Sequence, residues 1–172
     1  KRHRVAVMTT TGGGAASVVD RLGSFGVDVV GPTQAVIDGL AQKNIQIAAT
    51  RLTDLTLAGT KKEIYSGVLN ALLASDHCDM VLAVSGSSSQ FQPEVSVQPL
   101  IEADRHGKPL AVFLAPHAEA SLKLLAENKV AGFRTPEACA RCSTRRAWLT
   151  MGASIIFPFS ETTPSPSRSA LS

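Results

Sequence analysis

The sequence lacks the features that mark several classes of protein. It has only three cysteines in 172 residues, too few and too odd in number for a disulfide scaffold. No apolar run approaches the roughly 18 residues that span a membrane, and no signal peptide is recognisable, so we expect a cytoplasmic protein without membrane association. The net charge of +3 is small and not gathered into a basic stripe, which argues against nucleic-acid binding.

The composition is that of a globular protein with few aromatic side chains. Hydrophobic residues make up 44% and aromatic residues 5%, which indicates a core built of Val, Leu, Ile and Ala. The chain turns rich in Ser, Thr and Pro from Pro158, which is typical of disorder. We expect one α/β domain over residues 1–150 and a disordered tail or linker over 151–172. Because the sequence begins at Lys1, we expect a piece of a longer protein.

Apolar segments of strand length alternate with helical segments along the chain. Strands are expected at Val5–Met8, Val27–Val30, Ile45–Ala49, Asp79–Val84, Lys108–Leu114 and Val130–Phe133. Helices are expected at Ala15–Phe25, 33–41, 61–75, 93–106, His117–Asn128 and after Thr135. The runs VAVM, MVLAV and PLAVFL are continuously apolar, as strands covered on both faces require. This pattern predicts a doubly wound, mostly parallel sheet in a flavodoxin-like or Rossmann-like three-layer α/β sandwich.

Ligands bind beyond the carboxyl ends of the strands in such sheets, which selects four loops. These loops are Thr9–Gly14, Thr50–Thr60, Ser85–Gln92 and Ala115–His117. The serine-rich loop could bind a polar ligand, but it contains no nucleophile elbow, so a catalytic serine is not expected. Of the four histidines, His117 is the one placed to meet a ligand, and a surface or capping role is the alternative.

The glycine triplet Gly12–Gly14 stands between the first strand and the first helix. Glycines let backbone N–H groups approach a phosphate, and a helix N-terminus adds partial positive charge. The spacing is neither a dinucleotide fingerprint nor a P-loop, and Gly31 stands where a dinucleotide-binding domain has an acidic residue. The alternative is a tight turn that binds nothing.

The loop Thr50–Thr60 repeats this arrangement of hydroxyls and glycine before a helix. A second anion site is possible at Thr56, Gly59 and Thr60. Alternatively, Thr60 and Glu63 form a capping box that starts a helix near Lys61. The two interpretations are compatible, because a cap satisfies only some of the free N–H groups.

Two cysteines, Cys139 and Cys142, form a Cys-x-x-Cys motif. The motif lies in the helix that begins with Thr135 and Pro136, and no further ligands are visible. We therefore favour helix packing over a metal or redox site, which remains the alternative.

Three stretches together resemble one protein family over about residues 4–147. They are "RVAVMTTTGGGAASVVDRLGSFGVDVV", "TDLTLAGTKKEIYSGVLNALLASDHCDMVLAV" and "GKPLAVFLAPHAEASLKLLAENKVAGFRTPEACARC". Their order resembles the flavodoxin-like CoA-ligase domain of the NDP-forming acyl-CoA synthetases, which include succinyl-CoA synthetase, ADP-forming acetyl-CoA synthetase and ATP-citrate lyase. "GKPLAVFL" with "FRTPEACA" is the most specific part. "TDLT" is similar to the end of an Asn-Pro-x-Asp-Leu-Thr signature, whose start is replaced here by Arg51-Leu52-Thr53.

The resemblance implies a role in holding phosphate. In this family, the N-termini of two helices from two such domains surround a phosphorylated histidine. The positions that the resemblance assigns to phosphate are Thr11, Gly12, Gly13, Gly14, Thr56, Gly59 and Thr60. It implies no catalytic residue, no metal ligand and no tightly bound cofactor in this chain. CoA, ATP or ADP, and Mg²⁺ are expected only for the complete enzyme.

The chain also departs from the family. This sequence does not contain the segment that carries the phosphorylated histidine in the family. The ATP-grasp domain and the CoA-binding domain are absent from it as well. We therefore expect a domain that needs those three domains as partners, that is inactive alone, and whose exposed apolar surface favours homo-oligomers. The alternative is a non-catalytic CoA- or nucleotide-sensing or interaction module derived from the family. A Rossmann dehydrogenase is disfavoured by the missing fingerprint.

Overall fold

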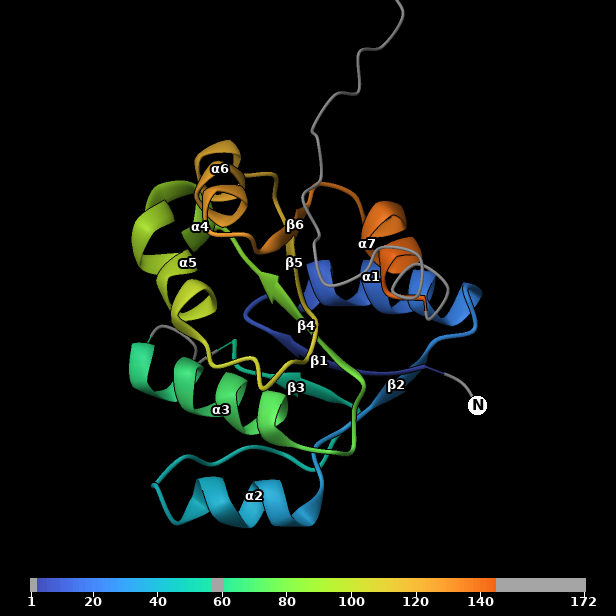
Figure 1. Ribbon diagram of the computed structural model, residues 1–172, viewed down its shortest axis with the longest axis vertical. Coiled ribbons are helices and arrows are strands. Elements are labelled where there is room, and N and C mark those ends of the chain that lie inside the picture. Colours follow the sequence, from blue (N-terminus) through green and yellow to red (C-terminus); the bar gives the residue numbers. More distant parts are fainter. Residues whose placement is uncertain (1–2, 57–60, 145–172) are drawn as a thin grey trace, which may run out of the picture.

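A computed structural model describes residues 3–56 and 61–144, and it contains a parallel sheet between layers of helices (Figure 1). The strands of the sheet are β1 (Arg4–Thr9), β2 (Asp28–Val30), β3 (Leu52–Asp54), β4 (Met80–Ser85), β5 (Leu110–Leu114) and β6 (Ala131–Phe133). All the pairings between them are parallel. The spatial order is β2-β1-β4-β5-β6, with β3 also paired to β1. The expected flavodoxin-like α/β fold is confirmed.

One edge of β1 is shared by two short strands. Its first half, Arg4–Ala6, pairs with β2, and its second half, Val7–Thr9, pairs with β3. The other edge of β1 pairs with β4 over five residue pairs, beginning at Val5 and Met80. The chain therefore leaves β1 toward one side of the sheet and later returns on the other side.

Helices cover both faces of the sheet (Figure 1). One face carries α1 (Gly12–Ser24) and α7 (Pro136–Cys142), which pack against each other. The other carries α3 (Lys62–Ala74), α5 (Pro93–Glu102) and α6 (Glu119–Glu127), with the short α4 (Ser88–Phe91) beside α5 and α2 (Gln34–Ala41) against α3. No helix within the described ranges combines the length and the apolarity needed to cross a bilayer.

The apolar strands divide their side chains between two cores. On β1 and β4, Met8 and Ala83 belong to the core under α3, α5 and α6, whereas Val7 and Leu82 belong to the core under α1 and α7. Because successive side chains of a strand point to opposite faces, both sets must be apolar. The continuous apolar runs of the sequence follow from this arrangement.

The third strand lies elsewhere than expected. Ile45–Ala49 is not a strand, although the Ile45 side chain is buried and Ile47 packs on the core. The strand is Leu52–Asp54, because this segment meets the free edge of β1 and bonds to it. Apolar side chains alone do not decide which backbone forms the pairing.

Several helix boundaries also differ from those expected. The glycine triplet is the first turn of α1, not a turn before it, and the polar loop after β4 contains α4. The helix α5 ends at Glu102, so His106 is not in a last helical turn. Instead, His106 adopts φ +48°, and its N–H donates to the Asp104 carboxylate.

The start of α3 agrees with the expected position, but not with the expected cap. Its N-cap is Lys61, whose side chain makes no capping bond. Thr60, the expected cap, lies outside the described residues. The expected tail over 151–172 lies outside them as well.

Candidate functional site

The selected loops are bonded to one another at the carboxyl edge of the sheet, and those after β1, β4 and β5 form the central part. The Thr10 N–H donates to the Val84 carbonyl at 3.0 Å, and the Gly86 N–H donates to Thr10 Oγ1 at 3.1 Å. The Ala115 N–H donates to the Ser85 carbonyl at 2.9 Å. The loops after β1, β4 and β5 therefore form one continuous surface at the point where the strand order reverses.

The third glycine of the triplet is required by packing. A Cβ atom at Gly14 would lie 2.7 Å from Cβ of Ala115 and 3.3 Å from Cγ1 of Val84. Real Cβ contacts are not that short, so only glycine fits here. The contact places the first turn of α1 directly against the loop that follows β5.

The first two glycines have no such explanation. A Cβ atom at Gly12 or Gly13 would meet nothing within 4 Å, and neither residue has a left-handed φ. Glycine costs a helix about 1 kcal/mol relative to alanine. What these two residues provide is exposed backbone that a ligand can approach closely.

The N-terminus of α1 keeps its backbone donors free. Thr11 is the N-cap, but its side chain makes no capping bond, and its own N–H donates to Thr9 Oγ1 at 2.9 Å. Within residues 3–56 and 61–144, the N–H groups of Gly12, Gly13 and Gly14 have no acceptor. The first turn contains no acidic residue. This end therefore carries an uncompensated partial positive charge that suits an anion.

In the described ranges, every other helix longer than α4 has a capping side chain or an acidic residue that offsets the partial positive charge of its N-terminus. Side-chain oxygens of Thr33 and Thr135 cap α2 and α7. The first turns of α3, α5 and α6 contain Glu63, Glu94 and Glu119. Among these helices, α1 alone has neither a capping side chain nor an acidic residue.

The loop after β3 lies beside the end of β1 but offers fewer donors. The Leu55 N–H donates to the Thr9 carbonyl at 2.8 Å, which joins the two loops. Both donors of Thr56 point to Asp54 Oδ1, with the N–H at 2.8 Å. In this structure Thr56 therefore has no donor left for phosphate, and a carboxylate lies next to it. Gly59 and Thr60, which complete the expected second phosphate site, lie outside the described residues.

Gly31, after β2, is explained by a close backbone approach. A Cβ atom there would lie 2.4 Å from the Thr50 carbonyl oxygen. No side chain fits, so the acidic residue that a dinucleotide-binding domain places here is sterically excluded.

Of the serines after β4, Ser89 serves the fold together with Ser121 of α6. The Ser89 hydroxyl donates to the Gly86 carbonyl, and the Ser121 hydroxyl donates to the Ser89 carbonyl at 2.6 Å. These bonds connect α4 and α6 to the end of β4.

His117 lies just before α6, not in it. Its Nε2 atom is 3.1 Å from a Glu119 oxygen, and Arg134 binds the same carboxylate at 2.7 Å. The Gln90 side chain donates to the His117 carbonyl at 2.8 Å. The histidine thus lies in an exposed polar chain at the rim of the carboxyl edge.

The cysteine pair packs in the core under α1. Cys139 and Cys142 are both buried, and burial raises the pKa of Cys142 to about 11 and that of Cys139 further. Both thiols are therefore protonated and unreactive at neutral pH. The part of the chain that the structure describes holds no group of three or more potential metal ligands.

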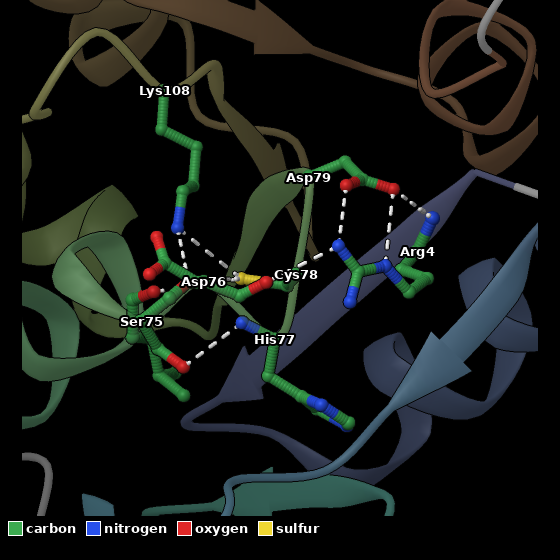
Figure 2. A network of polar contacts seen from close by, with 8 residues as sticks. Arg4, Ser75, Asp76, His77, Cys78, Asp79 and Lys108 are labelled. Carbon is green, nitrogen blue, oxygen red and sulfur yellow. Dashed lines mark hydrogen bonds and ion pairs between the residues drawn. The ribbon is translucent and has the colours of Figure 1, made fainter.

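The amino edge of the sheet is organised differently (Figure 2). Arg4 binds Asp79 through its guanidinium at 2.8 Å and through its backbone N–H at 2.9 Å. The Arg4 guanidinium lowers the pKa of Asp79 to about 2. The Lys108 ammonium donates to the Ser75 carbonyl and lies 3.8 Å from the Cys78 sulfur. Here Arg4 and Asp79 form an ion pair, and the Lys108 ammonium is held by a neutral carbonyl.

The fold resembles that of solved structures from Pyrococcus horikoshii OT3 and Ca. Korarchaeum cryptofilum. The chain is 20% identical to PH0766 from Pyrococcus horikoshii OT3, with a TM-score of 0.65, covering 83% of this chain and 34% of that one. It is 18% identical to dinucleotide forming acetyl-coenzyme A synthetase 1 from Ca. Korarchaeum cryptofilum, with a TM-score of 0.67, covering 83% and 32%. The same enzyme in complex with phosphate and ADP also matches, at 18% identity and a TM-score of 0.67, covering 81% and 31%.

No family model and no curated protein matches the sequence. The chain spans about a third of the length of the solved structures it matches. At these identities the likeness establishes a common fold. The chain has the flavodoxin-like fold of one part of an acetyl-coenzyme A synthetase, in agreement with its resemblance to the NDP-forming acyl-CoA synthetases.

Proposed function

We propose that this chain is one domain of an NDP-forming acyl-CoA synthetase, an acid–thiol ligase. In this proposal the N-terminus of α1 forms one side of the site that holds phosphate or phosphohistidine. The observation that carries the proposal is the open first turn of α1, where the three N–H groups of Gly12–Gly14 have no acceptor among residues 3–56 and 61–144. The structural neighbours support it, because one of them is an acetyl-coenzyme A synthetase in complex with phosphate and ADP.

The chemistry of this site is anion stabilisation. Three N–H groups can donate to phosphoryl oxygens, and the helix dipole adds to the attraction without any lysine. The Thr11 hydroxyl, which makes no capping bond, is a further donor. Because Gly12 and Gly13 carry no side chain, the phosphoryl group can approach the backbone closely. In this proposal the histidine that carries the phosphoryl group comes from another domain, so the isolated chain is expected to be inactive.

The remaining parts of the reaction belong to other domains in this proposal. CoA, ATP or ADP, and Mg²⁺ would be bound by the CoA-binding, phosphohistidine and ATP-grasp domains of a cytoplasmic enzyme. Among the described residues, no three side chains of His, Cys, Asp or Glu gather in one place. Expected partners are therefore domains of the same enzyme, and self-association is a further possibility to measure.

A negative charge introduced at Gly13 tests the proposed site. The open space at this position admits a side chain without a clash. Gly13→Glu places a carboxylate beside the free N–H groups, and Gly13→Gln is the uncharged control of the same shape. A charge about 4 Å from an anion costs from about 1 kcal/mol in water to about 4 kcal/mol at a protein surface. We expect the Glu variant to bind inorganic phosphate at least about fivefold more weakly than the Gln variant in calorimetric titration, the lower bound that about 1 kcal/mol implies. Equal affinities of the two variants would contradict the proposal.

A sensing or interaction module is the second candidate function. It is favoured by the loop after β3, where Asp54 occupies both donors of Thr56. Arg51, which replaces the start of the family signature, donates to the Val29 carbonyl at 3.0 Å and so serves the fold. Separate titrations with CoA, ATP and phosphate distinguish the two. Tight binding of CoA or ATP by this chain alone supports the module, whereas binding of phosphate only supports the synthetase domain.

A further inference from the structure

Three helices in the described ranges begin with a threonine at the N-cap, and only one of these threonines does not cap. Thr33 and Thr135, which begin α2 and α7, accept a hydrogen bond from the N–H three residues later, at 3.3 Å and 3.2 Å. Thr11 begins α1 with the same extended backbone, yet its side chain makes no capping bond. The N–H three residues later is that of Gly14. Neither the residue type nor the local backbone explains why this N–H stays open.

The methyl group of Thr11, not its hydroxyl, faces the first turn of α1. Thr11 Cγ2 is 3.0 Å from the position that a Cβ atom of Gly14 would take. Cβ of Ala115 and Cγ1 of Val84 are 2.7 Å and 3.3 Å from the same position. These carbons line a small apolar niche over Gly14. Because burial of a methyl group among apolar atoms is favourable, the niche favours the rotamer that directs Cγ2 inward.

Gly86, in the loop after β4, lies against the other side of the Thr11 side chain. A Cβ atom at Gly86 would be 3.2 Å from Thr11 Cβ and 3.6 Å from Thr11 Cγ2. The Gly86 N–H is bonded to Thr10 Oγ1. The backbone of Thr11 is fixed as well, because its N–H donates to Thr9 Oγ1 at 2.9 Å and its carbonyl accepts from the Thr9 hydroxyl at 2.7 Å. Contacts from other loops therefore set the rotamer of Thr11.

The Thr11 hydroxyl is left facing solvent. It has no hydrogen-bond partner among residues 3–56 and 61–144. In the same ranges, the buried side-chain polar atom without a partner is the Tyr65 hydroxyl, so the unpartnered Thr11 oxygen is not buried. A capping threonine would occupy one of the free donors of its helix. Here the Gly14 N–H and the Thr11 hydroxyl both remain available to a ligand.

We propose that the niche lined by Val84, Gly86 and Ala115 positions Thr11 so that it cannot cap α1, and thereby keeps the Gly14 N–H open to a phosphoryl oxygen. This inference rests on the proposed function. It gives three residues outside the glycine triplet a positioning role in the proposed site, without contact to the ligand. It also reverses the usual expectation for a conservative change. Serine has no methyl group for the niche to hold, so Thr11→Ser should close the site that threonine leaves open.

Amide hydrogen exchange of the full chain tests the rotamer. In Thr11→Ser the hydroxyl is free to cap, so the Gly14 N–H should exchange about fivefold more slowly than in the wild type, the factor that a typical capping bond implies. Thr135→Ser is the matched control, because that hydroxyl already caps α7, and exchange at Ala138 should stay unchanged. Equal exchange at Gly14 in the wild type and in Thr11→Ser would overturn the inference.

Titration of the full chain with inorganic phosphate tests the consequence for binding. Thr11→Ala has neither the methyl group nor a hydroxyl that could cap. In Thr11→Ser the phosphate must displace the capping bond, so we expect it to bind about fivefold more weakly to the Ser variant than to the Ala variant. If the Ser variant binds as tightly as the Ala variant or more tightly, the hydroxyl does not compete with the ligand and the inference is wrong.

The two measurements separate this inference from the proposed function. If the wild type binds phosphate but Gly14 exchanges equally in the wild type and in Thr11→Ser, the niche is not what keeps α1 open, and the proposed function stands. If exchange at Gly14 slows in Thr11→Ser but the wild type binds no phosphate, the proposed function is wrong. The role of the niche in binding is then wrong as well, and only its effect on the Thr11 rotamer stands.

Discussion

The two edges of the sheet differ in how completely their polar groups are paired. At the amino edge, Arg4 and Asp79 form an ion pair, and Lys108 donates to the Ser75 carbonyl (Figure 2). At the carboxyl edge, the N–H groups of Gly12–Gly14 have no partner within the described residues. The same strands end at both edges, so strand position alone does not make a binding site. Donors that the fold leaves free distinguish the carboxyl edge.

The largest effect on stability is expected at Gly14, and Gly13 provides the comparison. Gly14→Ala forces a Cβ atom to 2.7 Å from Ala115, and overpacking of this kind costs about 1–3 kcal/mol. Gly13→Ala meets open space and should stabilise the chain by about 0.5–1 kcal/mol. Urea denaturation of both variants measures the difference. Equal stabilities would show that the loop after β5 does not press on α1 as described.

An intermediate effect is expected from the helix caps. The Thr135 hydroxyl accepts from the Ala138 N–H at 3.2 Å, so Thr135→Ala should cost about 1 kcal/mol. Thr11 makes no capping bond, so Thr11→Val keeps its shape and should change stability by less than about 0.5 kcal/mol. Thermal unfolding compares the two. A large loss in Thr11→Val would mean that α1 is capped after all and that its end is not open to an anion.

The smallest effect on stability is expected at low pH, when Asp79 at the amino edge is protonated. The native pKa of Asp79 is about 2, below its ordinary 3.8, so the pair stabilises the fold above about pH 4 and this contribution is lost as pH falls toward 2. Because the Asp79 side chain is 38% exposed, solvent screening limits the contribution to about 1 kcal/mol or less. Unfolding measured from pH 6 to pH 2 should show less pH dependence in Asp79→Asn.

Phosphate binding provides the control for that variant. Asp79→Asn acts at the amino edge, so the affinity for phosphate at pH 7 should remain that of the wild type. A changed affinity would indicate that the two edges are coupled and would weaken the distinction between them.

The alternation of strands and helices could be predicted because each buried strand is an apolar run of its own. The strand β3 could not be predicted in this way, because it has only three residues and the polar Thr53 is in the middle, so it contains no apolar run. Its identity as a strand comes from the free edge of β1, which no local pattern reveals. Ile45 was misleading because its side chain is buried while its backbone pairs with nothing in the sheet.

The candidate site could be predicted only in part. The glycine triplet marks the right loop, but its members differ in role because Ala115, far along the sequence, packs against Gly14 alone. The uncapped state of Thr11 is a tertiary property as well, because the niche that holds its methyl group is lined by Val84 and Ala115. A threonine at an N-cap alone predicts a capping bond.

The way β1 shares one edge between β2 and β3 has a consequence for aggregation. The outermost strands on that side are three residues long each, and β6 on the opposite side has three residues as well. Long unpaired strands are templates on which other chains add, and very short ones are a common protection against this. Any self-association of this domain should therefore use side-chain surfaces and not extension of the sheet.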